Sequence, residues 1–119
     1  MEPRPDIVLL GTEWRPRALL RAQLIEEGFD VVATDTWSDA RRHLRPGMKP
    51  RLAIVDVQAL PDAEQVLADL RVLMKPDQVL VLSAMSAVSD EAIERLGFRT
   101  VKRPIAIEHI IEVVKNLIG

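Results

Sequence analysis

The feature that most constrains the fold is a regular alternation of short, strand-like runs with longer segments of helical periodicity. The apolar runs are mostly continuous rather than alternating with polar residues, which is typical of strands buried on both faces of a parallel sheet. The predicted strands are Ile7–Leu10, Phe29–Ala33, Leu52–Val55, Val79–Leu82 and Thr100–Lys102. In the second strand Asp30 interrupts the apolar run, and this favours a place at the sheet edge.

A helical segment follows each predicted strand. The predicted helices are Pro16–Glu27, Ser38–Leu44, Pro61 or Asp62 to about Met74, Ser89–Leu96 and Ile105–Ile118. Leu20 and Leu24, with Ala18 or Ile25, are expected to face the core from the first helix, and Ser38 is expected to cap the second. Strands that alternate with helices require crossover connections, so we predict one α/β domain over residues 1–119, with helices on both faces of a parallel sheet.

Composition excludes several classes of function. The chain has no cysteine, which rules out disulfides, thiol nucleophiles and cysteine-based zinc sites. Four aromatic residues and a net charge of −2 argue against nucleic-acid binding, in spite of a basic stretch between Arg41 and Arg51. No apolar run is long enough to cross a membrane, so we expect a cytoplasmic domain without membrane contact.

Polar residues follow four of the predicted strands, and in a parallel sheet the carboxyl ends of neighbouring strands meet at one edge. Gly11, Thr12 and Glu13 follow the first strand, and Asp56 follows the third. Ser83 follows the fourth strand, and the dipeptide Lys102–Arg103 lies at the end of the fifth. We therefore expect a carboxylate, a hydroxyl and one or two cations to converge on this edge.

This arrangement resembles the receiver domains of two-component response regulators over about Ile7 to Ile118. The resemblance implies a flavodoxin-like (βα)5 fold, a doubly wound sheet of five parallel strands in the order 2-1-3-4-5. It implies that Asp56 is the phosphoryl acceptor and that Ser83 is the hydroxyl that binds a phosphoryl oxygen. It also implies that Arg103, or Lys102 beside it, occupies the place of the lysine that neutralises the phosphorylated carboxylate in this family, although arginine differs from lysine in geometry.

The departures from the family pattern concern the metal and the switch. Receiver domains hold Mg²⁺ with two acidic residues after the first strand, where this chain has Gly11–Thr12. Asp56 and, weakly, Glu13 are the remaining candidate ligands, so we expect Mg²⁺ binding to be weak or absent. The loop after Asp56 is one residue longer than usual, and Thr100 stands where the family has an aromatic switch residue.

The first hypothesis is therefore a degenerate receiver domain, not an enzyme, that acts as a protein-interaction module. Its partners would be a histidine kinase, a phosphotransfer protein, an effector domain or a second copy of the chain. The family's usual contact face would include parts of Ala87–Leu96 and Glu108–Lys115 here. A working phosphoacceptor with altered metal dependence is the alternative. A small flavodoxin-like ligand-binding domain is a remote third reading, since the segment "GTEWRP" lacks a phosphate-loop pattern.

Two tryptophans are predicted to lie in loops near the strand ends. Trp14 comes two residues after Thr12, at the mouth of the expected site, and it either covers the cleft or packs against the start of the first helix. Trp37 precedes the second helix.

Overall fold

The predicted strands form one parallel sheet in the order β2-β1-β3-β4-β5. The structure is a computed structural model, and it describes residues 4–83, 89–102 and 106–119. The strands are β1 (Ile7–Leu10), β2 (Val31–Thr34), β3 (Leu52–Asp56), β4 (Val79–Leu82) and β5 (Arg99–Val101). The α/β class, the parallel pairing and the strand order are confirmed, and β2 is an edge strand as Asp30 suggested.

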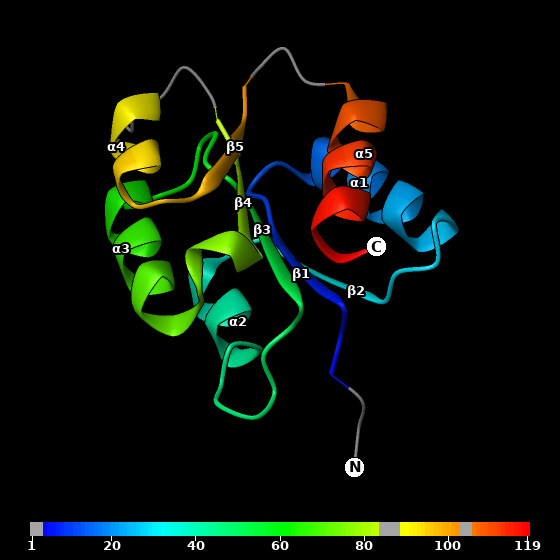
Figure 1. Ribbon diagram of the computed structural model, residues 1–119, viewed down its shortest axis with the longest axis horizontal. Coiled ribbons are helices and arrows are strands. Elements are labelled where there is room, and N and C mark those ends of the chain that lie inside the picture. Colours follow the sequence, from blue (N-terminus) through cyan, green and yellow to red (C-terminus); the bar gives the residue numbers. More distant parts are fainter. Residues whose placement is uncertain (1–3, 84–88, 103–105) are drawn as a thin grey trace.

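The helices cover both faces of this sheet. They are α1 (Trp14–Glu26), α2 (Trp37–Arg42), α3 (Ala63–Leu73), α4 (Asp90–Arg95) and α5 (Ile107–Ile118), with a short 3-10 helix, η1 (Pro76–Gln78), before β4. Figure 1 shows α1 and α5 on one side of the sheet and α2, α3 and α4 on the other. Within the described ranges, no helix combines the length and the apolar character needed to cross a bilayer.

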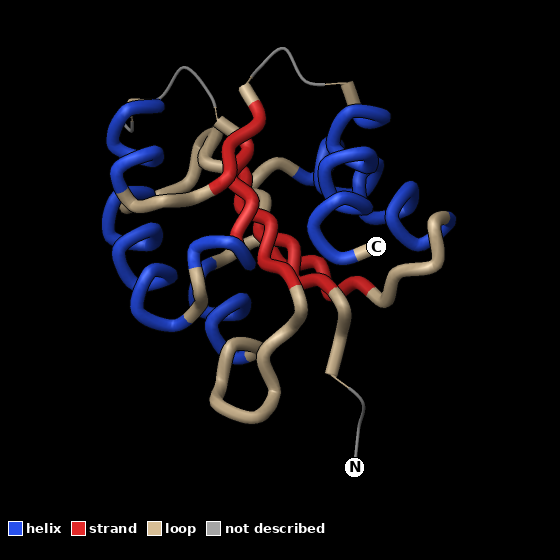
Figure 2. The backbone as a smooth tube through the Cα atoms, in the orientation of Figure 1, coloured by secondary structure: helices blue, strands red, loops and turns tan. Residues whose placement is uncertain are grey.

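Alternate side chains of the three central strands, β1, β3 and β4, supply two separate cores. Leu9, Ile54 and Leu80 pack under α1 and α5, and their side chains are at most 1% exposed. Leu10, Val55 and Val81 point the other way and pack under α2, α3 and α4. Figure 2 shows the strands as the central layer between the two groups of helices. Polar groups are therefore largely confined to the ends of the strands, because both faces are covered.

The predicted start of β2 at Phe29 is wrong by two residues. Gly28 adopts a positive φ of 94° at the end of α1. The Gly28 N–H donates to the Ile25 carbonyl at 2.9 Å, and the Phe29 N–H donates to the Leu24 carbonyl at 3.2 Å. These two bonds are those of a Schellman motif, so Phe29 still belongs to the end of the helix. Gly28 ends α1 as predicted, and the strand starts at Val31.

Three further local predictions differ from the structure. Thr36, not Ser38, caps α2, since its hydroxyl oxygen accepts a 3.1 Å hydrogen bond from the Asp39 N–H. Trp14 and Trp37 are the first residues of α1 and α2 and do not lie in loops. Ile25 is 43% exposed, whereas Leu20 and Leu24 are buried as predicted.

A matched pair of substitutions tests how far the central strands depend on burial. Val81 is fully buried in β4, and Val72 is 85% exposed on α3. We expect Val81→Ala to lower the free energy of unfolding by about 2 kcal/mol or more, because it removes two buried methyl groups and leaves a cavity. Val72→Ala should change it by less than about 0.5 kcal/mol. Urea denaturation followed by circular dichroism measures both, and equal effects would contradict the assignment of the core.

Candidate functional site

Asp56 is the last residue of β3, at the carboxyl edge of the sheet. Its register partner on β4 is Leu82, and the side chain of Asp56 is 8% exposed. The Asp56 Oδ1 atom accepts a 3.0 Å hydrogen bond from the backbone N–H of Gln58. This contact two residues ahead is an Asx turn, and it fixes the orientation of the carboxylate as the chain leaves the sheet.

Gly11 lies beside Asp56 at the end of β1. A Cβ atom built at Gly11 would lie 3.9 Å from the Asp56 Cβ and 3.5 Å from the Arg17 Cβ, both ordinary van der Waals distances. Gly11 is also not among the residues with positive φ. The backbone at Gly11 therefore has a conformation that other residues can adopt, and there is room for a Cβ atom. The fold does not require a glycine at position 11. The glycine nevertheless leaves this position of the edge without a carboxylate.

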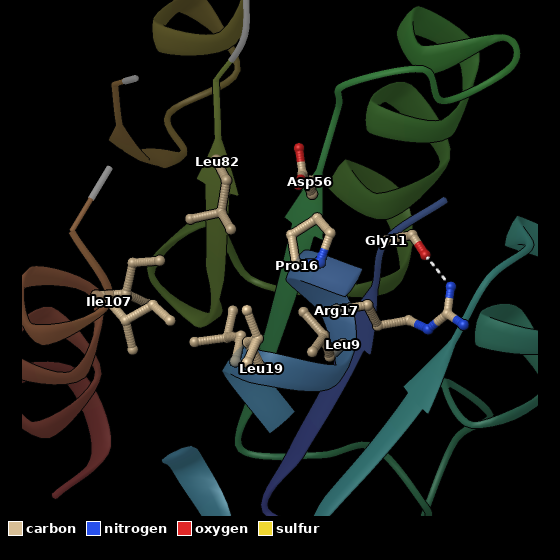
Figure 3. A pocket seen from close by; sticks show the side chains of 10 residues that line it. Leu9, Gly11, Pro16, Arg17, Leu19, Asp56, Leu82 and Ile107 are labelled. Atoms are coloured by element: carbon tan, nitrogen blue, oxygen red, sulfur yellow. Dashed lines mark hydrogen bonds between the residues drawn. The ribbon is translucent and has the colours of Figure 1, made fainter. Parts of the chain in front are cut away.

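Arg17 is the functional candidate that sequence reasoning missed. From the first turn of α1, its Nη1 atom donates to the Gly11 carbonyl oxygen at 2.7 Å and lies 3.5 Å from the Thr12 carbonyl oxygen. Figure 3 shows the guanidinium on the Gly11 carbonyl, pointing away from Asp56. Nothing in the local sequence distinguishes Arg17 from the other arginines of α1, because the carbonyls that it binds become visible only in three dimensions.

Asp56 and Arg17 line the same cavity, which has a volume of about 200 Å³. The rest of its wall is mainly apolar and comes from β1, β4, α1 and α5, including Leu9, Leu82 and Ile107. Trp14 is 70% exposed and is not one of the lining residues, so the idea that it covers this site is wrong. The cavity combines a nearly buried carboxylate with a cation on an apolar background.

The residues around Asp56 do not fit a Mg²⁺ site of the receiver type. Glu13 is exposed at the N-cap of α1, and Thr12 takes the place of the second acid. Within the described part of the chain, no group of three or more His, Asp or Glu side chains is arranged to hold a metal ion. Since Mg²⁺ depends on oxygen ligands in octahedral geometry, a single carboxylate beside a guanidinium is a poor donor set.

The remaining predicted site residues are Ser83, Lys102 and Arg103. Ser83 is 3% exposed, one residue beyond the register partner of Asp56, and its N–H donates to the Val101 carbonyl at 2.9 Å. The Lys102 Nζ atom lies 3.8 Å from Asp90 Oδ2, so this exposed ammonium pairs with α4. Arg103 lies outside the described residues. Asp56 and Ser83 thus share the carboxyl edge of neighbouring strands, and the roles of all these residues stay predictions.

The loop after Asp56 has an irregular backbone. Ala59 and Asp62 have φ angles of 58° and 52°, in the left-handed region that few residues other than glycine adopt. The resemblance to receiver domains predicts one additional residue in this loop. Thr100 is half-buried on β5 and donates a 3.4 Å hydrogen bond from its hydroxyl to the Phe98 carbonyl.

A pair of glycine substitutions tests whether Gly11 has a structural role. We expect Gly11→Ala to change the free energy of unfolding by less than about 1 kcal/mol, since a Cβ there meets no close contact. Gly28→Ala should lower it by about 1 kcal/mol or more, because its positive φ disfavours any side chain although the space is open. Thermal denaturation measures both. A larger loss at Gly11 would show that the fold requires a glycine there.

Comparison with known proteins supports the fold assignment. No protein-family model matches the sequence, and neither does any curated protein. A response regulator receiver protein from Pseudomonas putida matches with a TM-score of 0.80 and 20% identity, over 98% of this chain and 99% of that chain. A receiver protein from Sinorhizobium medicae gives 0.76 and 20%, over 96% and 94%. An adenylate cyclase from Rhodopirellula baltica gives 0.78 and 17%, over 97% and 87%.

These identities are low, so the likeness concerns the arrangement of the backbone. The resemblance inferred from Asp56 and the order of elements is confirmed at that level, because solved receiver domains superimpose on nearly the whole chain. The chain has the flavodoxin-like fold of the response regulator receiver domains.

Proposed function

We propose that the chain is a receiver-like signalling domain with a degenerate phosphorylation site, and that it acts as a protein-interaction module. The observation that carries this proposal is the position next to Asp56 on β1. A glycine stands there, and its carbonyl accepts a hydrogen bond from Arg17 at 2.7 Å. The edge of the sheet thus retains the acceptor carboxylate without the acidic neighbours that would recruit a metal ion.

The proposal follows from the charge that phosphoryl transfer creates. When a phosphodonor such as acetyl phosphate transfers its phosphoryl group to Asp56, a carboxylate oxygen forms a bond to phosphorus and acetate leaves. Negative charge then gathers on the equatorial oxygens beside an already anionic side chain, and it must be neutralised by cations. The Arg17 guanidinium points away from Asp56 to backbone carbonyls, so it is not placed for this role in the described conformation.

The surface formed by α4, β5 and α5 is suited to contacts between charged side chains. The chain's exposed large apolar side chains, as far as its residues are described, lie elsewhere: Trp14, Leu19, Ile25, Met48 and Val72. The described part of the α4–β5–α5 surface instead exposes charged side chains, including Glu91, Arg95 and Lys102. A partner or a second copy of the chain would therefore contact it mainly through complementary charges. Ala87 and Val88, at the start of the predicted range, lie outside the described residues.

A working phosphoacceptor is the second candidate, and one observation favours it. Asp56 and Arg17 line the same cavity, so a rotation of the arginine side chain would bring a permanent positive charge toward the carboxylate. Phosphorylation would then proceed with little dependence on Mg²⁺. This candidate differs from the first in a measurable property, the incorporation of a phosphoryl group at Asp56.

Intact-mass spectrometry after incubation with acetyl phosphate separates the two. We expect the unmodified sequence to gain no phosphoryl group, with or without Mg²⁺. Gly11→Asp combined with Thr12→Asp should give measurable Mg²⁺-dependent incorporation, because it restores two acidic residues after β1, the first of them at a position whose Cβ would lie 3.9 Å from the Asp56 Cβ. Adding Asp56→Asn to this variant should abolish the gain.

The matched control is Gly11→Asn combined with Thr12→Asn, which has the same shape without the charges. Incorporation into the unmodified sequence that disappears in Asp56→Asn would overturn the degenerate assignment and favour the second candidate. Incorporation that persists in Asp56→Asn would show modification at another residue.

A further inference from the structure

A second cavity opens at the same edge of the sheet, on the opposite face from the Asp56 cavity. It has a volume of about 500 Å³ and lies where the loops after β1, β2 and β3 meet the start of α3. We call it the Trp37 cavity; the residues that define it for this argument are Asp35, Trp37, Leu60, Asp62, Gln65 and Val66. Neither Asp56 nor Ser83 lines it, so the proposed phosphorylation chemistry does not account for it.

The wall of this cavity is apolar and aromatic. Leu60 and Val66 are buried members of the core under α2, α3 and α4, and the partly buried Trp37 packs against that core. Two of the lining residues, Trp37 and Thr12, each have a buried polar atom, Nε1 and Oγ1, without a hydrogen-bond partner among the described residues. An aromatic ring beside aliphatic side chains offers a surface for an apolar stem and for a flat cation.

The charged groups of the wall are both carboxylates. Asp35 and Asp62 are exposed and come from the loops after β2 and β3, and among the described residues no lysine, arginine or histidine lines the cavity. Gln65 is tied to its own helix, since its side-chain amide donates to Asp69 Oδ1 at 3.0 Å. Arg41, Arg42 and Arg45 lie beyond Trp37, where they line a different cavity. Two carboxylates at an aromatic wall are complementary to a cation.

We propose that the Trp37 cavity binds an arginine side chain of a protein partner. The aliphatic part of that side chain would pack on Leu60 and Val66, and its guanidinium would stack on Trp37 and pair with Asp35 and Asp62. A guanidinium suits this wall better than an ammonium does, because it is planar, weakly hydrated and able to form paired hydrogen bonds with carboxylates. The site does not require phosphorylation of Asp56 and stands independently of the function proposed above.

The test uses n-butylguanidinium as the probe, with n-butylurea as its neutral counterpart and pentanoate as the anion. The chain has two tryptophans, so its indole N–H groups give two nitrogen–proton NMR signals, which Trp14→Phe assigns. We expect n-butylguanidinium to shift the Trp37 signal saturably, with a Kd on the order of 1–10 mM for so small a probe. The backbone signals of Asp35, Asp62 and Gln65 should move with the same Kd, and the Trp14 signal should not.

Charge removal supplies the discriminating variants. Asp35→Asn combined with Asp62→Asn should weaken binding of n-butylguanidinium by at least about fivefold, because both carboxylates are lost. Asparagine tolerates the left-handed conformation of residue 62, so the fold should persist. Asp77→Asn, an exposed change in η1, is the matched control and should alter the Kd by less than about twofold.

Three results would overturn the proposal. Equal affinity for n-butylurea would show that the cavity selects apolar stems without regard to charge. An unchanged Kd in the double variant would show that the carboxylates do not take part. Absence of a saturable shift of the Trp37 signal at about 50 mM probe would show that no guanidinium binds there.

Discussion

The register of the parallel sheet is the constraint on which the rest of the structure depends. Helices cover both faces, so a charged group has access to water only where a strand ends. Asp56 occupies such an end, and pairing of β3 with β1 and β4 sets it beside Gly11 and close to Ser83. A shift of one residue in β3 would turn Asp56 toward the opposite core. The position of Asp56 is therefore a consequence of register before any chemistry is considered.

The Arg17 guanidinium is held differently from a metal ion. A bound Mg²⁺ would be fixed by acidic residues and would place two positive charges next to the Asp56 carboxylate. The Arg17 guanidinium is instead anchored by the neutral carbonyls of Gly11 and Thr12. Its hydrogen bonds brace the turn between β1 and α1, so moving it toward Asp56 would leave those carbonyls to find other donors. The arrangement stabilises the loop, and this favours a structural over a catalytic use of Arg17.

The sequence predicted those features that depend on periodicity and strand order. The apolar runs of β1, β3 and β4 located the sheet, and the carboxyl-end rule placed Asp56 and Ser83 on one edge. Prediction from the sequence failed where local hydrogen bonds decide the ends of helices and strands. Examples are Phe29, which completes the end of α1, and Thr36, which caps α2. The prediction also missed Arg17 and the Trp37 cavity. The Arg17 contact is local, but it depends on how the turn after β1 directs its carbonyls, and the Trp37 cavity joins loops distant in sequence; neither leaves a periodic or compositional signal.

The two cavities share one structural element, the turn after β1. Gly11 lines the Asp56 cavity and its neighbour Thr12 lines the Trp37 cavity, so the same backbone bounds a site on each face of the sheet. Arg17 hydrogen-bonds to this turn at Gly11 and lies near the Thr12 carbonyl, which limits how far either residue can move alone. Coupling between the sites would require the turn to have two arrangements that ligands stabilise differently. A turn braced by Arg17 is a poor candidate for such a switch, and binding at the Trp37 cavity should therefore be insensitive to the state of Asp56.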